Sequence, residues 1–128
     1  MALIKATLNK TVTLDESVAV LTWSGLTLSG DIGDAQSFAN FSDKTFIASG
    51  NFTGAPTIVI QGCNDQVLGD WVTLSNRQGT AMSFTVLGMN TSQDRPVFVR
   101  PLVTAGTGGG AVIITCACHH TDLPTNNN

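Results

Sequence analysis

The chain has 128 residues, only 12% of them charged, and a formal net charge of −3. A single domain of this length buries roughly 65 to 70% of its unfolded surface, so one domain with a real core is expected. The six lysines and arginines are scattered and no run approaches about 18 apolar residues, so we expect no nucleic-acid partner and no membrane partner.

The first third of the chain predicts extended structure more than helix. Residues 1–16 alternate weakly between apolar and polar, which is typical of an extended arm or an edge strand. Residues 17–29 are rich in Val, Leu and Thr and predict a strand or arm that bends at Gly25 and is anchored by Trp23. Residues 30–34 have the composition of a turn, and residues 35–41 predict a short helical turn or an irregular loop.

The clearest strand pattern lies in residues 45–52, where Phe46, Ala48, Gly50 and Phe52 share one face. This period of two predicts a half-buried strand. Further strands are predicted at residues 57–61, 71–75, 82–86, 97–103 and 111–118, with turns at residues 54–56, Gly79, Gly88 and residues 106–110.

A β-hairpin is predicted in residues 58–74, where a β-branched run, the turn Gly62-Cys63-Asn64-Asp65 and a strand led by Trp71 follow one another. Pro101 interrupts the strand pattern of residues 97–103 and favours an edge strand or a bulge, because proline has no backbone N–H to donate. Arg100 then points the opposite way from Val99.

Together these short strands predict an all-β fold. We expect a single-domain antiparallel β-sandwich, jelly-roll-like, that spans residues 17–118. The extended N-terminal arm or edge strand of residues 1–16 precedes it, and residues 119–128 are expected to form a flexible C-terminal tail because they lack apolar periodicity.

The densest set of soft ligands is Cys116-Ala-Cys118-His119-His120. Zinc accepts cysteine and histidine, but structural zinc sites usually draw their ligands from two separated pairs, and Cys63 stands alone. Cys116, Cys118, His119 and His120 are therefore weak metal-ligand candidates, and we expect no metal and no cofactor. The two cysteines are expected to be buried or to face another subunit.

The sequence shows no recognisable arrangement of catalytic residues. Serine and histidine both occur, but no acid is placed to orient a histidine, and the glycine-rich residues 106–110 lack the lysine and the helix of a phosphate loop. We expect a protein that is not an enzyme, with no catalytic residues. Three cysteines are an odd number, and without a secretory leader free thiols and synthesis in a host cytoplasm are expected.

Several segments resemble the head decoration (cement) proteins of tailed bacteriophages, a group of small β-sandwich proteins. They are residues 23–26, 30–31, 48–54, 60–65, 71–74, 78–79 and 99–101, and the resemblance extends over about residues 23–118. It implies a non-enzymatic protein on the capsid exterior of the virion, which binds the major capsid protein across neighbouring capsomers. It also implies a homo-oligomer, with a trimer favoured over a dimer.

For this role we expect the N-terminal segment to contact the capsid or another subunit. An arm that becomes ordered only on binding can cover a wide surface. The contact candidates are Met1, Leu3, Ile4, Leu8, Val12 and Leu14.

The alternative is a receptor- or carbohydrate-binding β-sandwich module of a virion or tail. An exposed indole offers a flat apolar face to a sugar ring, and loop carboxylates and amides can bind its hydroxyl groups. The candidate ligand-binding residues are Asp31, Asn64, Asp65 and Trp71.

Overall fold

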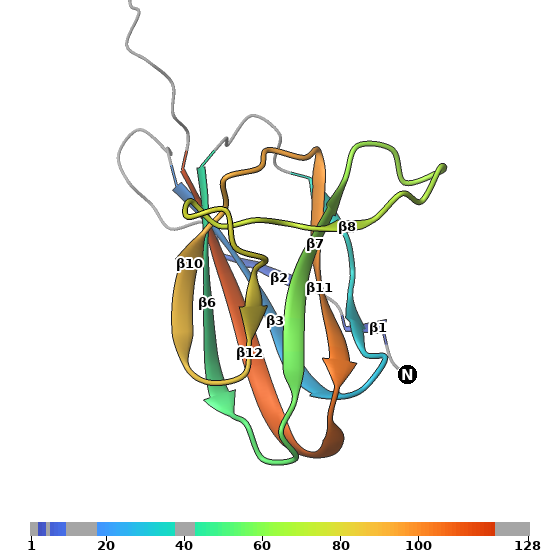
Figure 1. The fold of residues 1–128 in the computed structure, drawn as a ribbon, viewed down its shortest axis with the longest axis vertical. Helices are drawn as coiled ribbons and strands as arrows, with labels where there is room; N and C mark the ends of the chain where they lie inside the picture. The colour runs from blue at the N-terminus through green and yellow to red at the C-terminus, as the bar shows by residue number, and fades with distance from the viewer. Residues whose placement is uncertain (1–2, 5, 10–17, 38–42, 120–128) are drawn as a thin grey trace, which may run out of the picture.

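The computed structural model describes residues 3–4, 6–9, 18–37 and 43–119. These residues form twelve β-strands and no helix. They accordingly contain no helical segment with the length and apolarity needed to cross a membrane. The strands form two sheets that pack face to face over one core (Figure 1), so the predicted single-domain all-β sandwich is confirmed.

The first sheet has seven strands in the order β1-β4-β11-β7-β8, with β5 also paired to β11 and β9 also paired to β7. Its pairs are antiparallel except for β1 with β4, which run parallel. We call it sheet A. Its strands are β1 (Leu3–Ile4), β4 (Ile32–Gly33), β5 (Gln36–Ser37), β7 (Thr57–Cys63), β8 (Val72–Thr73), β9 (Ser83–Phe84) and β11 (Phe98–Ala105).

The second sheet, sheet B, has five strands in the order β10-β6-β12-β3-β2, and every pair in it is antiparallel. The long strands β3, β6 and β12 form its centre. The strands are β2 (Ala6–Asn9), β3 (Val18–Leu28), β6 (Asp43–Asn51), β10 (Gly88–Thr91) and β12 (Thr107–His119).

The core lies between the inner faces of the two sheets, and alternation along each strand places its residues there. Phe46 and Ala48 are fully buried, as the pattern of residues 45–52 predicts, whereas Gly50 is exposed and Phe52 is only partly buried at the margin of the core. The core cluster consists of Leu21, Trp23, Leu26, Phe46, Ala48, Ile58, Ile60, Leu74, Met82, Phe84, Val99, Val103, Val112, Ile114, Cys116 and Cys118.

Trp23 anchors β3 as expected. Its side chain is fully buried, and its Nε1 donates hydrogen bonds to the backbone oxygen of Asp34 at 3.0 Å and to Asp34 Oδ1 at 3.2 Å. The indole thereby ties sheet B to the segment that connects β4 and β5 of sheet A. A buried indole N–H needs such a partner.

The predicted turns at residues 54–56 and Gly79 are present, whereas two other predicted turns are displaced or shorter than expected. Gly88 begins β10 and pairs with Ala48 of β6, and the chain bends earlier, around the exposed Val86 and Leu87. Residues 107–110 belong to β12, with a register shift between Thr107 and Val112 that absorbs the glycines as a bulge. Sequence alone cannot show that a neighbouring strand supplies the hydrogen bonds of glycine residues.

Residues 30–41 also differ from expectation. The predicted turn is limited to residues 29 and 30, because Ile32–Gly33 forms β4. In place of a helical turn or loop, Gln36–Ser37 forms β5 against β11. Residues 38–41 lie outside the described residues. Of the strand predicted at residues 82–86, only Ser83–Phe84 forms a strand, β9, which pairs with β7.

Pro101 lies in the interior strand β11, so the prediction of an edge position or a bulge is wrong. β7 pairs with one side of β11, and β4 and β5 pair with the other. Val103 exchanges hydrogen bonds with the segment before β4, and by alternation Pro101 turns its nitrogen to the same side. There the partner strand is interrupted between Gly33 and Gln36, and the proline ring packs over Gly33.

The N-terminal segment supplies an edge strand to each sheet. β1 pairs with β4 through Leu3 and Ile4, and β2 pairs with β3, where Leu8 lies opposite Leu21. Leu3 is exposed and Ile4 packs against the core. Of the remaining contact candidates, Met1, Val12 and Leu14 lie outside the described residues, as do residues 120–128 of the predicted tail.

Candidate functional site

The loop between β7 and β8 is the most prominent feature of sheet A. The pairs Gln61 with Thr73 and Gly62 with Val72 confirm the predicted hairpin. The connection is longer than the tight turn predicted, since it spans residues 64–71. Asp65 organises it: Asp65 Oδ1 accepts a hydrogen bond from Val67 N at 2.9 Å, and its backbone oxygen accepts one from Gly69 N at 3.1 Å.

An open groove of about 490 Å³ lies beside this loop. Asn64, Asp65 and Asp70 line one part of it, and Asp94 and Arg95 line another. The groove therefore presents several carboxylates and one guanidinium, which suits hydrogen bonding to a polar ligand. Asn64 is partly committed, because its Oδ1 accepts a hydrogen bond from the backbone N–H of Val97 at 3.2 Å.

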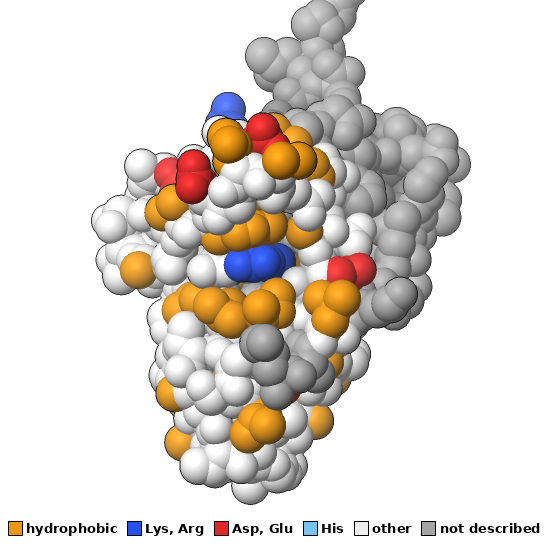
Figure 2. Space-filling model, turned by 90° about the vertical axis from the view of Figure 1, so that its right-hand side faces the viewer, with side chains coloured by type: hydrophobic (Ala, Val, Ile, Leu, Met, Phe, Trp, Pro, Cys, Tyr) orange, Lys and Arg blue, Asp and Glu red, His pale blue; other side chains and the backbone are white. Residues whose placement is uncertain are grey.

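Trp71 and Arg100 form a stacked pair on the outer side of sheet A. The guanidinium carbon of Arg100 lies 3.9 Å from the centre of the indole, and Arg100 Nε donates to Gln61 Oε1 at 2.9 Å. This arrangement is a cation–π contact. Partial burial lowers the pKa of Arg100 from its usual value, yet arginine stays charged at neutral pH. In Figure 2 a basic group lies between two bands of hydrophobic side chains.

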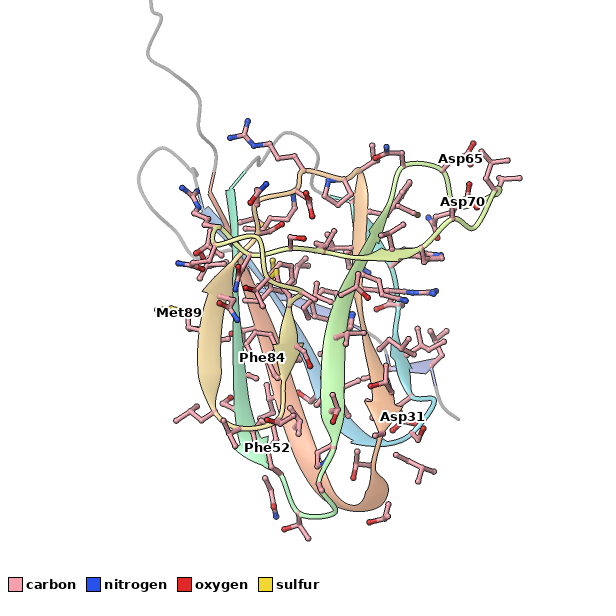
Figure 3. All side chains as sticks on the ribbon, viewed as in Figure 1. Asp31, Phe52, Asp65, Asp70, Phe84 and Met89 are labelled. Carbon is pink, nitrogen blue, oxygen red and sulfur yellow. The ribbon has the colours of Figure 1, made fainter. Side chains whose placement is uncertain are left out.

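Asp31 does not join this site. Its side chain is only 4% exposed, and its Oδ2 accepts hydrogen bonds from the backbone N–H groups of Thr27 at 3.2 Å and Leu28 at 3.0 Å. Figure 3 shows it at the other end of sheet A from Asp65 and Asp70. Asp31 therefore closes the turn after β3. Asn64 and Asp65 line the groove, and Trp71 lies in the chain between Asp70 and Val72, which also line it.

Cys116 and Cys118 lie side by side in the core. Both are fully buried on the inner face of β12, and their sulfur atoms are 3.6 Å apart. Lys44 is the register partner of Cys118 and is also buried. Burial, with the neighbouring thiol of Cys118, raises the pKa of Cys116 well above its usual value, so this thiol is protonated and unreactive at neutral pH.

These cysteines therefore face the interior of the sandwich and not another subunit. The side chain of His119 and the whole of His120 lie outside the described residues. Within residues 3–4, 6–9, 18–37 and 43–119, no three His, Cys, Asp or Glu side chains come together in a group that could hold a metal ion.

Sequence reasoning placed Arg100 on the face opposite Val99, and this is correct, since Val99 is fully buried and Arg100 is partly exposed. It did not pair Arg100 with Trp71. Trp71 immediately precedes β8 and Arg100 lies in β11, and they meet because β7 lies between β8 and β11. Arg95 was also missed, because a single arginine in a loop gives no periodic signal.

No protein-family model and no curated protein matches the chain. A prophage-derived protein has a similar fold. It is YomS of the SPBc2 prophage, with a TM-score of 0.55 and 15% identity over 85% of this chain and 98% of YomS. At this identity the likeness shows the fold alone.

Two cupin structures are less similar. The cupin domain of Cnp3 from Schizosaccharomyces pombe has a TM-score of 0.43 and 9% identity over 95% of this chain and 72% of its own. A cupin protein from Bacteroides fragilis has a TM-score of 0.42 and 12% identity over 95% of this chain and 82% of its own. Scores this low carry no argument about function.

Proposed function

We propose that the chain is a structural protein of bacteriophage particles that decorates the capsid and stabilises it across neighbouring capsomers. In this proposal the protein is not an enzyme. It is made in the host cytoplasm, binds the major capsid protein from the capsid exterior and acts as a homo-oligomer. Its fold resembles that of a prophage-derived protein, which supports a phage origin.

The observation that carries the proposal is the outer face of sheet B. Leu21, Phe46 and Ile114 are fully buried on the inner face, so the residues next to them along each strand point outward. A protein surface can cover uncharged residues without removing water from an ion. Among the residues whose side chains the structure describes, those that point outward include Val20 and Thr22 of β3, Thr45, Ile47 and Ser49 of β6, Met89 and Thr91 of β10, and Ile113, Thr115 and Ala117 of β12, and none of these is charged.

The N-terminal strands extend this proposal. Leu3 is 64% exposed on β1 at one edge of sheet A, and β2 forms an edge of sheet B. An exposed leucine on an edge strand can pack against a neighbouring protein. The N-terminal residues therefore remain our candidates for additional contacts with the capsid or with another subunit.

The test uses capsids of the phage whose genome encodes the chain, stripped of accessory proteins and mixed with the purified protein. Cryo-electron microscopy is expected to show the protein at fixed lattice positions. Thr115→Lys places a charge at the centre of the outer face of sheet B, and we expect it to lower occupancy at least about tenfold, because the lysine must lose water on contact. Thr80→Lys, at an exposed turn, adds the same charge elsewhere and is expected to bind like the wild type.

Two outcomes would count against the proposal in different ways. Wild-type protein that occupies no lattice position contradicts capsid decoration itself. Wild-type protein that binds, with Thr115→Lys and Thr80→Lys binding equally well, contradicts only the assignment of the contact to sheet B.

A second candidate function is a receptor- or carbohydrate-binding module. The stacked Trp71–Arg100 pair and the adjacent groove favour it, because a sugar acid could lie against the indole and meet the guanidinium. On a glycan array this function predicts reproducible binding that Trp71→Ala abolishes while the melting temperature changes by only a few degrees. An array without reproducible binding by the wild type excludes the glycan form of this candidate.

A further inference from the structure

Strand β10 forms one edge of sheet B, with β6 as its partner on one side (Figure 1). Ser92 N donates to the backbone oxygen of Lys44 at 3.0 Å. Backbone groups alternate in direction along an antiparallel strand, so those of Gly88 and Asn90 face β6 and those of Met89 point away from it. No described strand pairs with that outer side of Met89.

The far end of β10 is covered. Ser92 forms an isolated bridge with Asn76, and Asn76 Nδ2 donates to Asn90 Oδ1 at 3.2 Å. The open part of the edge is therefore short and centred on Met89. This limits the number of backbone hydrogen bonds that an added strand can form.

Exposed apolar side chains gather at the same place. Met89 is 65% exposed and lies opposite Ile47, which is 38% exposed. Val86 and Leu87, just before β10, are 67% and 71% exposed. Figure 3 shows Met89 projecting from the margin of the sandwich. An apolar patch that coincides with an open strand edge marks an interaction surface.

Most of the usual protections of an edge strand are absent from β10. Proteins guard such edges with lysine, proline, a bulge or an inward-pointing charge. The sequence of β10 is Gly88-Met89-Asn90-Thr91, and its register with β6 runs without a shift over all four pairs. The short length of this edge is the one feature that limits pairing with another strand.

We propose that a second copy of this chain binds at this edge, with the two β10 strands antiparallel across a two-fold axis at Met89. Each Met89 then donates its N–H to the backbone oxygen of the other, and Met89, Leu87 and Ile47 of both copies form one apolar contact. An antiparallel edge is its own complement about a two-fold axis, so the same surface serves both partners.

The size of the surface sets the strength of the dimer. A stable interface of standard size buries about 800 Å² per partner, more than four apolar side chains and one short strand supply. The dimer is therefore weak and forms reversibly with concentration. The cement-protein resemblance implies a trimer, whereas pairing about a two-fold axis ends at two copies, so the measured mass discriminates between these expectations.

The test is sedimentation equilibrium of the full chain from about 1 to 500 µM, the range in which a weak contact of this size populates both states. We expect a monomer–dimer equilibrium. Met89→Glu and Met89→Lys are each expected to raise the dissociation constant at least about tenfold, because either charge must be buried in the contact. The chain carries a formal net charge of −3, so Met89→Glu increases the repulsion between two copies and Met89→Lys decreases it. A weaker dimer in both variants therefore cannot result from the change in net charge.

The matched control is Val67→Glu, which adds the same charge at a side chain that is 94% exposed in the β7–β8 loop. It should leave the dissociation constant within about twofold, since an exposed charge outside a contact is largely screened. Hydrogen exchange provides a second readout. Protection of the Met89 amide is expected to rise with protein concentration, while the Asn90 amide, which faces β6, is protected in the monomer as well.

Any of four results would overturn the proposal. They are a wild-type monomer at the highest concentration, a trimer, a dimer that Met89→Glu and Met89→Lys do not weaken, and a dimer in which the Met89 amide gains no protection. None of these results depends on capsid binding, so failure of this proposal and failure of the proposed function are distinguishable.

Discussion

Trp23→Ala is expected to lower the free energy of unfolding by about 4 kcal/mol, because it removes the largest fully buried side chain of the core. The substitution leaves a cavity between the sheets. It also removes the hydrogen bonds from Nε1 to Asp34, so the backbone oxygen of Asp34 loses a partner. Urea denaturation followed by far-ultraviolet circular dichroism measures the change.

Trp71→Ala is the matched control for this loss. Trp71 is only partly buried and packs against Arg100, so we expect its removal to cost about 1 kcal/mol or less. If the two tryptophans prove equally costly to remove, Trp23 is not the anchor between the sheets that the structure indicates.

Gly50→Ala is expected to cost about 3 kcal/mol. Gly50 has a φ of +95°, a left-handed conformation in which an L-residue costs roughly 1 kcal/mol or somewhat more. An added Cβ would also lie 2.5 Å from the backbone oxygen of Ala111 on the neighbouring strand β12, and neither backbone can move without disturbing the pairing of β6 with β12. The same denaturation experiment measures this loss.

Gly79→Ala isolates the conformational part of that cost. Gly79 has a φ of +81°, but a Cβ built there meets nothing within 4 Å. We expect a loss of about 1 kcal/mol. Equal losses for Gly50→Ala and Gly79→Ala would show that β6 and β12 accommodate the methyl group and that only the backbone conformation matters.

The sequence predicted the fold best where local pattern and burial agree. Phe46 and Ala48 alternate with polar residues on a central strand and are fully buried, as expected. Trp23 also lies where expected, fully buried on β3. In such segments the hydrophobic period alone decides which side faces the core.

Prediction failed where a neighbouring strand overrides a local preference. Gly88 has the propensity of a turn residue, but its hydrogen bonds with Ala48 place it in a strand. Pro101 is unfavourable within a sheet, and its tolerance in β11 depends on the interruption between β4 and β5. Both outcomes depend on the order of strands in the sheet, which a single sequence does not contain.

The candidate site was only partly predictable for the same reason. Asn64 and Asp65 are neighbours in the chain, so their common position on one loop followed from sequence. Asp31 belongs to a separate turn and uses its carboxylate to accept backbone hydrogen bonds. The meeting of Trp71 with Arg100 requires three strands in a particular order, and no spacing in the sequence indicates it.

The strand order also constrains when the protein can fold during synthesis. β11 lies between β4 and β7, and β12 lies between β3 and β6, yet they are the last two strands in chain order. Until a ribosome has released both, β3, β6 and β7 have no central partner, and their apolar faces are open to other nascent chains. Folding must therefore wait for nearly the whole sandwich and then proceed through contacts distant in sequence, which makes it slow. Chaperone binding to the nascent chain is most valuable in that interval.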